Sequence, residues 1–175
     1  IDEVDVISRL VEDLNTLSSA DAGVLRIHRE TTDLGELMRE VASSFEAEAA
    51  ANGVKLRVTP PPEVVVQVDL QRIRQVLENL LTNSLRHTAA GGEISLELRD
   101  ADTRVEMSVS DTGTGIAPED LEHIFERYRK GPDSAGSGLG LAIARRLAEA
   151  HGGTIRAASV VGQGTTITMS LPKLG

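Results

Sequence analysis

The spacing of apolar residues along the chain follows two periods, and these periods predict which segments are helices and which are strands. A spacing of three and four positions indicates a helix with one buried face. Asp33 and Asp69 directly precede two such stretches and are suited to cap their first turns. Residues 2–18 have the apolar spacing of a helix that packs against other helices. Their two heptads would bury little surface, so they are expected to be the end of a longer helix. Helical spacing occurs over residues 2–18, 33–52, 69–90 and 139–151.

Strict alternation of apolar and polar residues predicts short strands between these helices. Prolines 60–62 separate the first two strands, and Ala101-Asp102 provides a turn that joins the next two in a hairpin. Residues 117–137 are polar and weakly periodic, so they are expected to form a lid with short helical pieces. Alternation occurs over residues 54–58, 64–68, 94–98, 105–109, 154–159 and 165–171.

This order of elements predicts an α+β fold of two layers. Strands interleaved with three helices, joined by hairpins in place of crossovers, indicate a mixed, mostly antiparallel sheet covered by helices on one face. The domain is expected to occupy residues 33–175, joined by a linker, residues 19–32, to the helix over residues 1–18. Because the 175-residue chain lacks an initiating Met, we interpret it as a piece of a longer protein.

Composition narrows the possible partners. A net charge of −9 argues against nucleic-acid binding, which depends on Lys and Arg at the phosphates. Any bound polyphosphate therefore needs local cations and a metal ion. The chain has no cysteine, which excludes disulfides and thiolate metal sites, and no apolar run approaches the length of a membrane-spanning helix.

The glycines are concentrated near the C-terminal end, in two motifs. Eleven of sixteen lie in the last 65 residues, among them DTGTGI at 111–116 and GSGLGL at 136–141. Gly136, Gly138 and Gly140 precede a predicted helix, whose free amides would bind an anion. No strand leads directly into this motif and no Lys-Ser/Thr follows it, which excludes the Rossmann and Walker A patterns.

Two asparagines on the helix over residues 69–90 are candidate ligands. Asn79 and Asn83 are four positions apart, so their amides project from one face and can converge on one ligand. An amide oxygen is a suitable hard ligand for Mg²⁺. The alternative, that both amides are merely solvated, is equally open from this helix alone.

Asp111 is the most informative polar residue. It falls on the same alternating face as the core residues of the strand over 105–109, and a buried carboxylate requires a donor such as the exocyclic amine of adenine. The alternative is a turn aspartate that caps the loop over residues 112–115. Gly113 and Gly115 follow at a spacing that lets a flat base lie against the main chain, which favours the ligand interpretation.

Cations for phosphate lie between the two glycine motifs, at Arg127, Arg129 and Lys130, although a solvated polar lid would have the same composition.

None of the four histidines has a partner at metal-site spacing. His87 is placed to lie against a nucleotide. His151 is expected to be structural, as a cation in the last turn of a helix.

Five motifs in order make the chain resemble the catalytic ATP-binding domain of bacterial sensor histidine kinases, in the GHKL superfamily (the Bergerat fold). The similarity covers residues 33–172. QVLENLLTNSLRHT (75–88) resembles the N box, DTGTGI the G1 box, IFERYRKG (124–131) the F box, GSGLGL the G2 box, and GQGTT (162–166) the last glycine motif. RLVEDLNTLSSADAG (9–23) resembles the end of the second helix of the dimerisation and phosphoacceptor domain, with its linker.

The resemblance implies roles for individual residues. Asn83 would bind Mg²⁺, Asp111 the adenine amine, and Ile116, Leu139 and Thr165 would surround the base. No residue of this chain is certain to be catalytic, because the helix with the phosphoacceptor His is missing. Departures from the family are His87, where many relatives have Tyr, and a short lid. The expected ATP-binding set is Asn79, Asn83, Arg86, His87, Asp111, Gly113, Gly115, Ile116, Arg127, Arg129, Lys130, Gly136, Gly138, Leu139, Gly140 and Thr165.

The function implied is that of an ATP-dependent protein histidine kinase with ATP and Mg²⁺ as cofactors. Its parent would be a homodimer in the bacterial inner membrane, with this domain in the cytoplasm, and would pass the γ-phosphoryl group to its own histidine and then to a response regulator. One alternative is a GHKL ATPase, whose general-base Glu would stand where this chain has Asn79; Glu78 lies about 100° away around the helix. Another is a nucleotide-binding regulatory or pseudokinase module.

Overall fold

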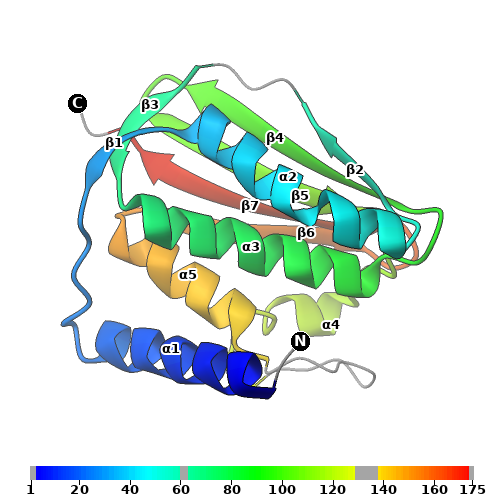
Figure 1. Ribbon diagram of the computed structural model, residues 1–175, viewed down its shortest axis with the longest axis horizontal. Helices are drawn as coiled ribbons and strands as arrows, with labels where there is room; N and C mark the ends of the chain where they lie inside the picture. Colours follow the sequence, from blue (N-terminus) through cyan, green and yellow to red (C-terminus); the bar gives the residue numbers. More distant parts are fainter. Residues whose placement is uncertain (1–2, 60–62, 129–137, 174–175) are drawn as a thin grey trace.

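The computed structural model describes residues 3–59, 63–128 and 138–173, which form a sheet layer and a helix layer (Figure 1). The helices are α1 (Glu3–Asp21), α2 (Leu34–Ala51), α3 (Leu70–His87), α4 (Pro118–Leu121) and α5 (Gly140–Ala150). The strands are β1 (Glu30–Asp33), β2 (Lys55–Val58), β3 (Val65–Val68), β4 (Glu93–Ala101), β5 (Arg104–Asp111), β6 (Thr154–Val160) and β7 (Gly164–Pro172).

Five of the strands form one mixed sheet in the order β2-β4-β5-β7-β6. Strand β2 runs parallel to β4, whereas the other neighbours are antiparallel. Strands β1 and β3 pair with each other in a separate two-stranded ribbon. Helices α2, α3 and α5 lie side by side across one face of the large sheet (Figure 1). The predicted two-layer fold with a mostly antiparallel sheet and three covering helices is therefore confirmed.

The two predicted helix caps are present. Asp33 Oδ1 accepts a hydrogen bond of 2.8 Å from the Gly35 amide, and Asp69 Oδ1 accepts one of 3.1 Å from the Arg72 amide. Helix α3 ends at His87, earlier than predicted, because the next residue, Thr88, has extended backbone angles. The predicted end at Gly91-Gly92 instead forms the turn into β4.

The segment expected to be a linker is partly ordered in regular structure. Helix α1 continues to Asp21, and Gly23 follows with a left-handed backbone, φ +67°. Residues 30–33 form β1 against β3, with Thr31 opposite Gln67. The irregular connection is thus limited to residues 22–29. Sequence spacing missed this strand because ETTD has no alternating apolar residues.

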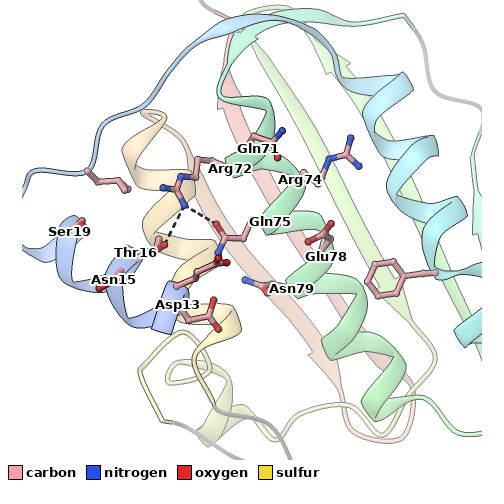
Figure 2. A pocket seen from close by; sticks show the side chains of 13 residues that line it. Asp13, Asn15, Thr16, Ser19, Gln71, Arg72, Arg74, Gln75, Glu78 and Asn79 are labelled. Carbon is pink, nitrogen blue, oxygen red and sulfur yellow. Dashed lines mark hydrogen bonds between the residues drawn. The ribbon is translucent and has the colours of Figure 1, made fainter. Parts of the chain in front are cut away.

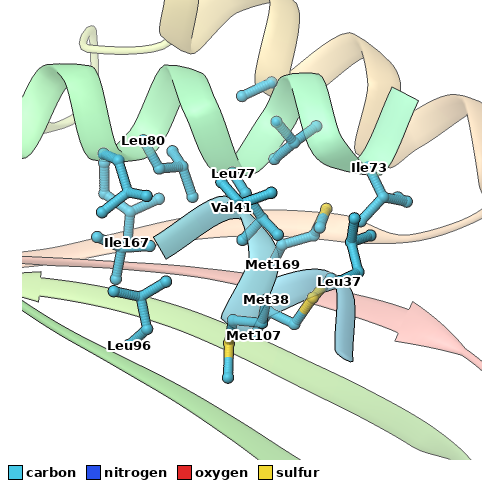
Figure 3. Packing of buried hydrophobic residues seen from close by; sticks show 14 of the residues in the cluster. Leu37, Met38, Val41, Ile73, Leu77, Leu80, Leu96, Met107, Ile167 and Met169 are labelled. Carbon is cyan, nitrogen blue, oxygen red and sulfur yellow. The ribbon is translucent and has the colours of Figure 1, made fainter. Parts of the chain in front are cut away.

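The hydrophobic core lies between the sheet and the helices (Figure 3). The apolar stripe predicted on α3 is buried, with Ile73, Leu77 and Leu80 at most 1% exposed. It faces β-strand residues such as Met107 and Met169, which are equally buried. Since burial of each large side chain contributes roughly 1.5–3 kcal/mol, this layer fixes α3 on the sheet and with it the polar residues on the neighbouring face of the helix.

Candidate functional site

Asp111 lies at the end of β5, where three protein groups donate hydrogen bonds to its carboxylate. Its Oδ1 accepts from the Gly113 amide at 2.9 Å and from the Thr165 amide at 3.2 Å, and its Oδ2 accepts from the Ser84 hydroxyl at 3.1 Å. The residue is 9% exposed. The bond to Gly113 is the turn contact that sequence analysis held as an alternative. The other two contacts come from β7 and α3, so Asp111 joins three elements as well.

A small hydroxyl network continues from Asp111 toward β6. The Ser159 hydroxyl accepts a hydrogen bond of 2.8 Å from the Ile116 amide and donates one of 2.8 Å to the Gly164 carbonyl. It also lies 2.9 Å from the Thr165 hydroxyl. Ile116 and Thr165, both expected around a base, are therefore held beside Asp111. Leu139 is 2% exposed and packs in the hydrophobic core.

The glycines near Asp111 are required by neighbouring protein backbone. A Cβ on Gly113 would lie 2.3 Å from the His87 carbonyl oxygen, and one on Gly115 would lie 2.2 Å from that of Val160. Gly115 also has φ +68°. The structure shows that both glycines let the loop after β5 pack against α3 and the β6–β7 turn. Contact of a flat base with the main chain at these glycines stays a prediction.

The polar side chains of α3 differ in whether they already form hydrogen bonds within the described part of the protein. Asn79 is buried, and its Nδ2 donates a hydrogen bond of 3.2 Å to the Gly140 carbonyl of α5. Asn83 is half-buried, and among the described residues nothing hydrogen-bonds its side chain. Arg86 is exposed. His87 is half-buried, and burial, together with the Arg86 charge, lowers its pKa although Asp111 opposes this. The imidazole is therefore neutral at pH 7.

The second glycine motif leads into α5. Gly138 has φ +72°, and its carbonyl accepts a hydrogen bond of 2.9 Å from the Tyr128 amide. The helix begins at Gly140, and the side chain of its N-cap residue, Leu139, does not cap the first turn. Because the first amides of a helix lack intrahelical partners, this end can accept an anion.

Of the three expected phosphate cations, only Arg127 lies within the described residues. Its guanidinium forms an ion pair with Asp21, at the end of α1. Arg129, Lys130 and Gly136 lie outside the described residues.

Next to Asn79, a polar groove of about 760 Å³ runs between α1 and α3 (Figure 2). Arg72 crosses it, because its Nη1 donates to Thr16 Oγ1 at 3.4 Å and to Gln75 Oε1 at 3.2 Å. Glu78 lines the groove too. Asp111 is not among the residues that line this groove.

His151 is structural, as expected, but it is not the cation that its place at a helix end suggested. It is 2% exposed, and burial lowers its pKa, with help from Arg29 and Arg72 and against the opposing effects of Leu147 and Asp69. Its Nε2 accepts a hydrogen bond of 3.1 Å from the Asp69 amide, so Nδ1 must carry the proton that it donates to the Leu147 carbonyl at 2.7 Å. The ring is therefore neutral.

Two hydroxyls of the site, those of Ser84 and Ser159, are not among the residues expected from the sequence. Both carried a signal, since Ser84 is a polar residue on a buried face and Ser159 is one on a partly buried face. Ser84 continues the apolar stripe of α3, and Ser159 follows Ile155 and Ala157 on the inward side of β6. In the part of the chain that the structure describes, no group of three His, Cys, Asp or Glu side chains is arranged to hold a metal ion, and no helix has the length and apolar composition needed to cross a membrane.

The chain is similar in sequence and in structure to several histidine kinases. The chain is 36% identical to the signal transduction histidine-protein kinase BaeS of Escherichia coli strain K12, in an alignment that covers 97% of this chain and 38% of BaeS. The structure of full-length ShkA in complex with AMPPNP superposes with a TM-score of 0.86 at 32% identity, over 97% of this chain and 36% of ShkA.

A third similar structure is that of histidine kinase ThkA in complex with the response regulator protein TrrA. It has a TM-score of 0.75 at 27% identity, over 98% of this chain and 51% of the matched one. The chain therefore spans well under half the length of BaeS and ShkA. The family of histidine kinase-, DNA gyrase B-, and HSP90-like ATPases matches residues 68–175, which include Asp111, both asparagines and both glycine motifs, and the chain belongs to this family.

Proposed function

We propose that this chain is the ATP-binding catalytic part of a sensor histidine kinase. It binds Mg·ATP and presents the γ-phosphoryl group to a histidine outside residues 1–175, from which the group passes to an aspartate of a response regulator. The similarity to BaeS, to ShkA bound to AMPPNP and to ThkA bound to TrrA supports this proposal.

The observation that carries the proposal is the incomplete hydrogen bonding of Asp111. A carboxylate has about four acceptor positions, and groups within the described residues fill three, two of them on Oδ1 and one on Oδ2. The remaining position on Oδ2 suits one further donor, such as the exocyclic amine of adenine. Since the three existing donors hold the carboxylate rigidly, it is preorganised to select a base that carries an amine.

Ile116 and Thr165, fixed beside Asp111 by the Ser159 network, would contact the base. Leu139 and His87 would line its surroundings, and the neutral His87 ring adds no charge there. Gly113 and Gly115 contribute indirectly, because they allow the close packing that places the Asp111 loop.

The phosphates would lie toward the start of α5. The first turn of α5 begins at Gly140, two residues after Gly138, and it offers amide donors and the positive end of the helix dipole. Arg86, Arg127, Arg129 and Lys130 are the cations that an acidic chain needs for this ligand. Their charges would stabilise the phosphoryl group during transfer.

Asn83 is the residue best suited to hold Mg²⁺. Its half-buried amide makes no hydrogen bond to the described part of the chain, which leaves its oxygen available to a hard cation. The bound ion would neutralise charge on the phosphate oxygens. The protein therefore contributes position and charge, and the proposal requires no general base within this chain.

The alternative of a GHKL ATPase has less support. Asn79, at the place where that branch carries its base, donates a hydrogen bond to α5, and Glu78 lines the groove between α1 and α3. The alternative of a nucleotide-binding regulatory or pseudokinase module would use the same residues to bind ATP, so only an assay of phosphoryl transfer separates it from the kinase.

The proposal extends to the parent protein. Residues 1–18 would be the end of a dimerisation helix, residues 19–32 a linker and residues 33–175 the catalytic domain. The parent would be a homodimer of the bacterial inner membrane with this part in the cytoplasm, and its second partner would be the cognate response regulator.

Calorimetric titration of ATP with Mg²⁺ into the chain and its Asp111→Asn variant tests the proposal. The substitution keeps the shape of the side chain but places an amide donor against the adenine amine, so affinity should fall by about ten- to a hundredfold. Asp102→Asn, at the opposite end of β5, makes the same chemical change and should leave affinity unaltered. Equal binding by wild type and Asp111→Asn, or none by either, would refute the adenine site.

A second experiment tests transfer of the γ-phosphoryl group. Radiolabel from the γ-phosphate of ATP should appear on the histidine-bearing domain of the parent when that domain is supplied in trans. Tight ATP binding without any transfer would instead favour the regulatory module.

A further inference from the structure

We propose that Asp21, at the end of α1, competes with ATP phosphates for Arg127 and so makes nucleotide affinity depend on the position of α1. This inference rests on the proposed function. It starts from one contact, the ion pair between the Asp21 carboxylate and the Arg127 guanidinium, which joins residues 106 positions apart.

The backbone beside Arg127 is fixed at the phosphate end of the site. The neighbouring amide, that of Tyr128, donates a hydrogen bond of 2.9 Å to the Gly138 carbonyl, just before α5 begins. Tyr128 itself has φ +59°, an uncommon conformation for a residue with a side chain. The backbone at Arg127 is thus held close to the start of α5, while its guanidinium pairs with Asp21 of α1.

Asp21 is held in place by a second cation. Its Oδ1 lies 3.3 Å from Arg146 Nη2 of α5, and Arg146 also pairs with Glu149 at 3.1 Å. The body of α1 is fixed as well, since Leu17 is 1% exposed and Thr16 receives the hydrogen bond from Arg72. The carboxylate therefore stays beside Arg127 as long as α1 lies against α5 (Figure 1).

The pair opposes phosphate binding in two ways. A guanidinium neutralised by a carboxylate attracts a phosphate less, and the carboxylate repels an approaching anion. When α1 moves away from α5, both effects disappear and Arg127 becomes available. Movement of the helix that precedes the domain is thereby converted into a change in ATP affinity.

The expected size of the effect is modest. The side chains of Asp21 and Arg127 are both 39% exposed, and exposed ion pairs are weak. Apparent affinity falls in proportion to the fraction of molecules with Arg127 available, so freeing it should raise ATP affinity about two- to fivefold.

The test measures ATP affinity for wild type and for Asp21→Asn, by displacement of a fluorescent ATP analogue at low salt. Asp21→Asn should bind ATP about two- to fivefold more tightly and adenosine equally well, because the competition concerns phosphates alone. Glu119→Gln is the matched control. This residue is exposed on α4 and forms no ion pair with the described residues, so its loss of one negative charge should leave affinity unaltered.

The double variant locates the effect at Arg127. Arg127→Ala should bind ATP more weakly than wild type, and adding Asp21→Asn should then give a clearly smaller gain, because only the repulsion between the Asp21 carboxylate and the phosphates is left to remove. An equal gain in both backgrounds, a gain for adenosine, or a gain in Glu119→Gln would overturn the role of Asp21. Wild type that binds ATP no more weakly than Asp21→Asn would overturn it too, whereas absence of ATP binding in every variant would overturn the proposed function itself.

Discussion

At the scale of single residues, Gly162 and Gly164 show how differently two glycines of one turn are constrained. Both have positive φ, +76° and +114°. A Cβ on Gly162 would point into open space, whereas one on Gly164 would lie 1.8 Å from the Asp111 carbonyl oxygen. Gly164 therefore permits the close approach of β7 to the end of β5, and Gly162 only serves the turn.

Alanine substitution at the two positions should separate strain from collision. Gly162→Ala should lower the free energy of unfolding by about 1 kcal/mol, the cost of a left-handed backbone with a side chain. Gly164→Ala should lower it by about 3 kcal/mol or more and weaken ATP binding, because two backbones must separate beside Asp111. Urea unfolding measures both. Equal losses would contradict the assigned contact.

The importance of Asp111 was predictable from the sequence, because the alternation in β5 places its carboxylate on the buried face of the strand. A buried carboxylate is unusual. Its donors were not predictable, since Thr165 follows 54 residues later and Ser84 lies on a helix. A pattern along one element indicates that a buried charge needs partners without identifying them.

At the scale of elements, the start of α3 is the point where three segments meet. Asp69 caps the helix through its Oδ1, accepts the His28 amide at 3.0 Å through Oδ2, and donates its own amide to His151 at the end of α5. The connection from α1, the central helix and α5 are thus joined through one residue.

Asp69→Ala should therefore destabilise the fold more than loss of an ordinary cap. We expect about 2–3 kcal/mol, because the amides of His28 and Arg72 both lose their acceptor. Asp33→Ala, which removes the cap of α2 alone, should cost about 1 kcal/mol. Guanidinium unfolding of both variants checks the difference, and equal values would show that the His28 contact adds nothing.

The elements themselves were largely predictable where their signals are local. The caps of α2 and α3 and the β4–β5 hairpin depend on residues within a few positions of each other. The parallel pairing of β2 with β4 and the β1–β3 ribbon depend on the path of the chain between distant segments, which periodicity does not encode. The same applies to the Asp21–Arg127 pair.

At the scale of the whole molecule, the buried neutral histidines make stability depend on pH. The pKa of His151 in the folded state is lowered below its usual 6.5, and that of His87 is lowered too. As pH falls below about 6.5, the unfolded chain binds protons that the folded chain excludes. The contribution of these rings is therefore complete above this pH; below it, stability should fall by up to about 1.4 kcal/mol per pH unit for the buried His151 and by less for the half-buried His87.

Thermal unfolding between about pH 7.5 and 5.5 measures this slope before the carboxylates titrate. His151→Asn should remove its share of the slope, whatever its effect on stability at neutral pH. An unchanged slope in His151→Asn would show that the ring takes up a proton without leaving its contacts.

The position of β7 has a consequence for synthesis of the protein. This strand lies between β5 and β6, yet it is the last strand along the chain, and its contacts with β5 join residues about 60 positions apart. On the ribosome, the helices and β4–β5 emerge while the middle of the sheet is still absent, with an unpaired strand edge exposed. The domain can complete its fold, and align Thr165 with Asp111, only after residues 164–172 have left the exit tunnel.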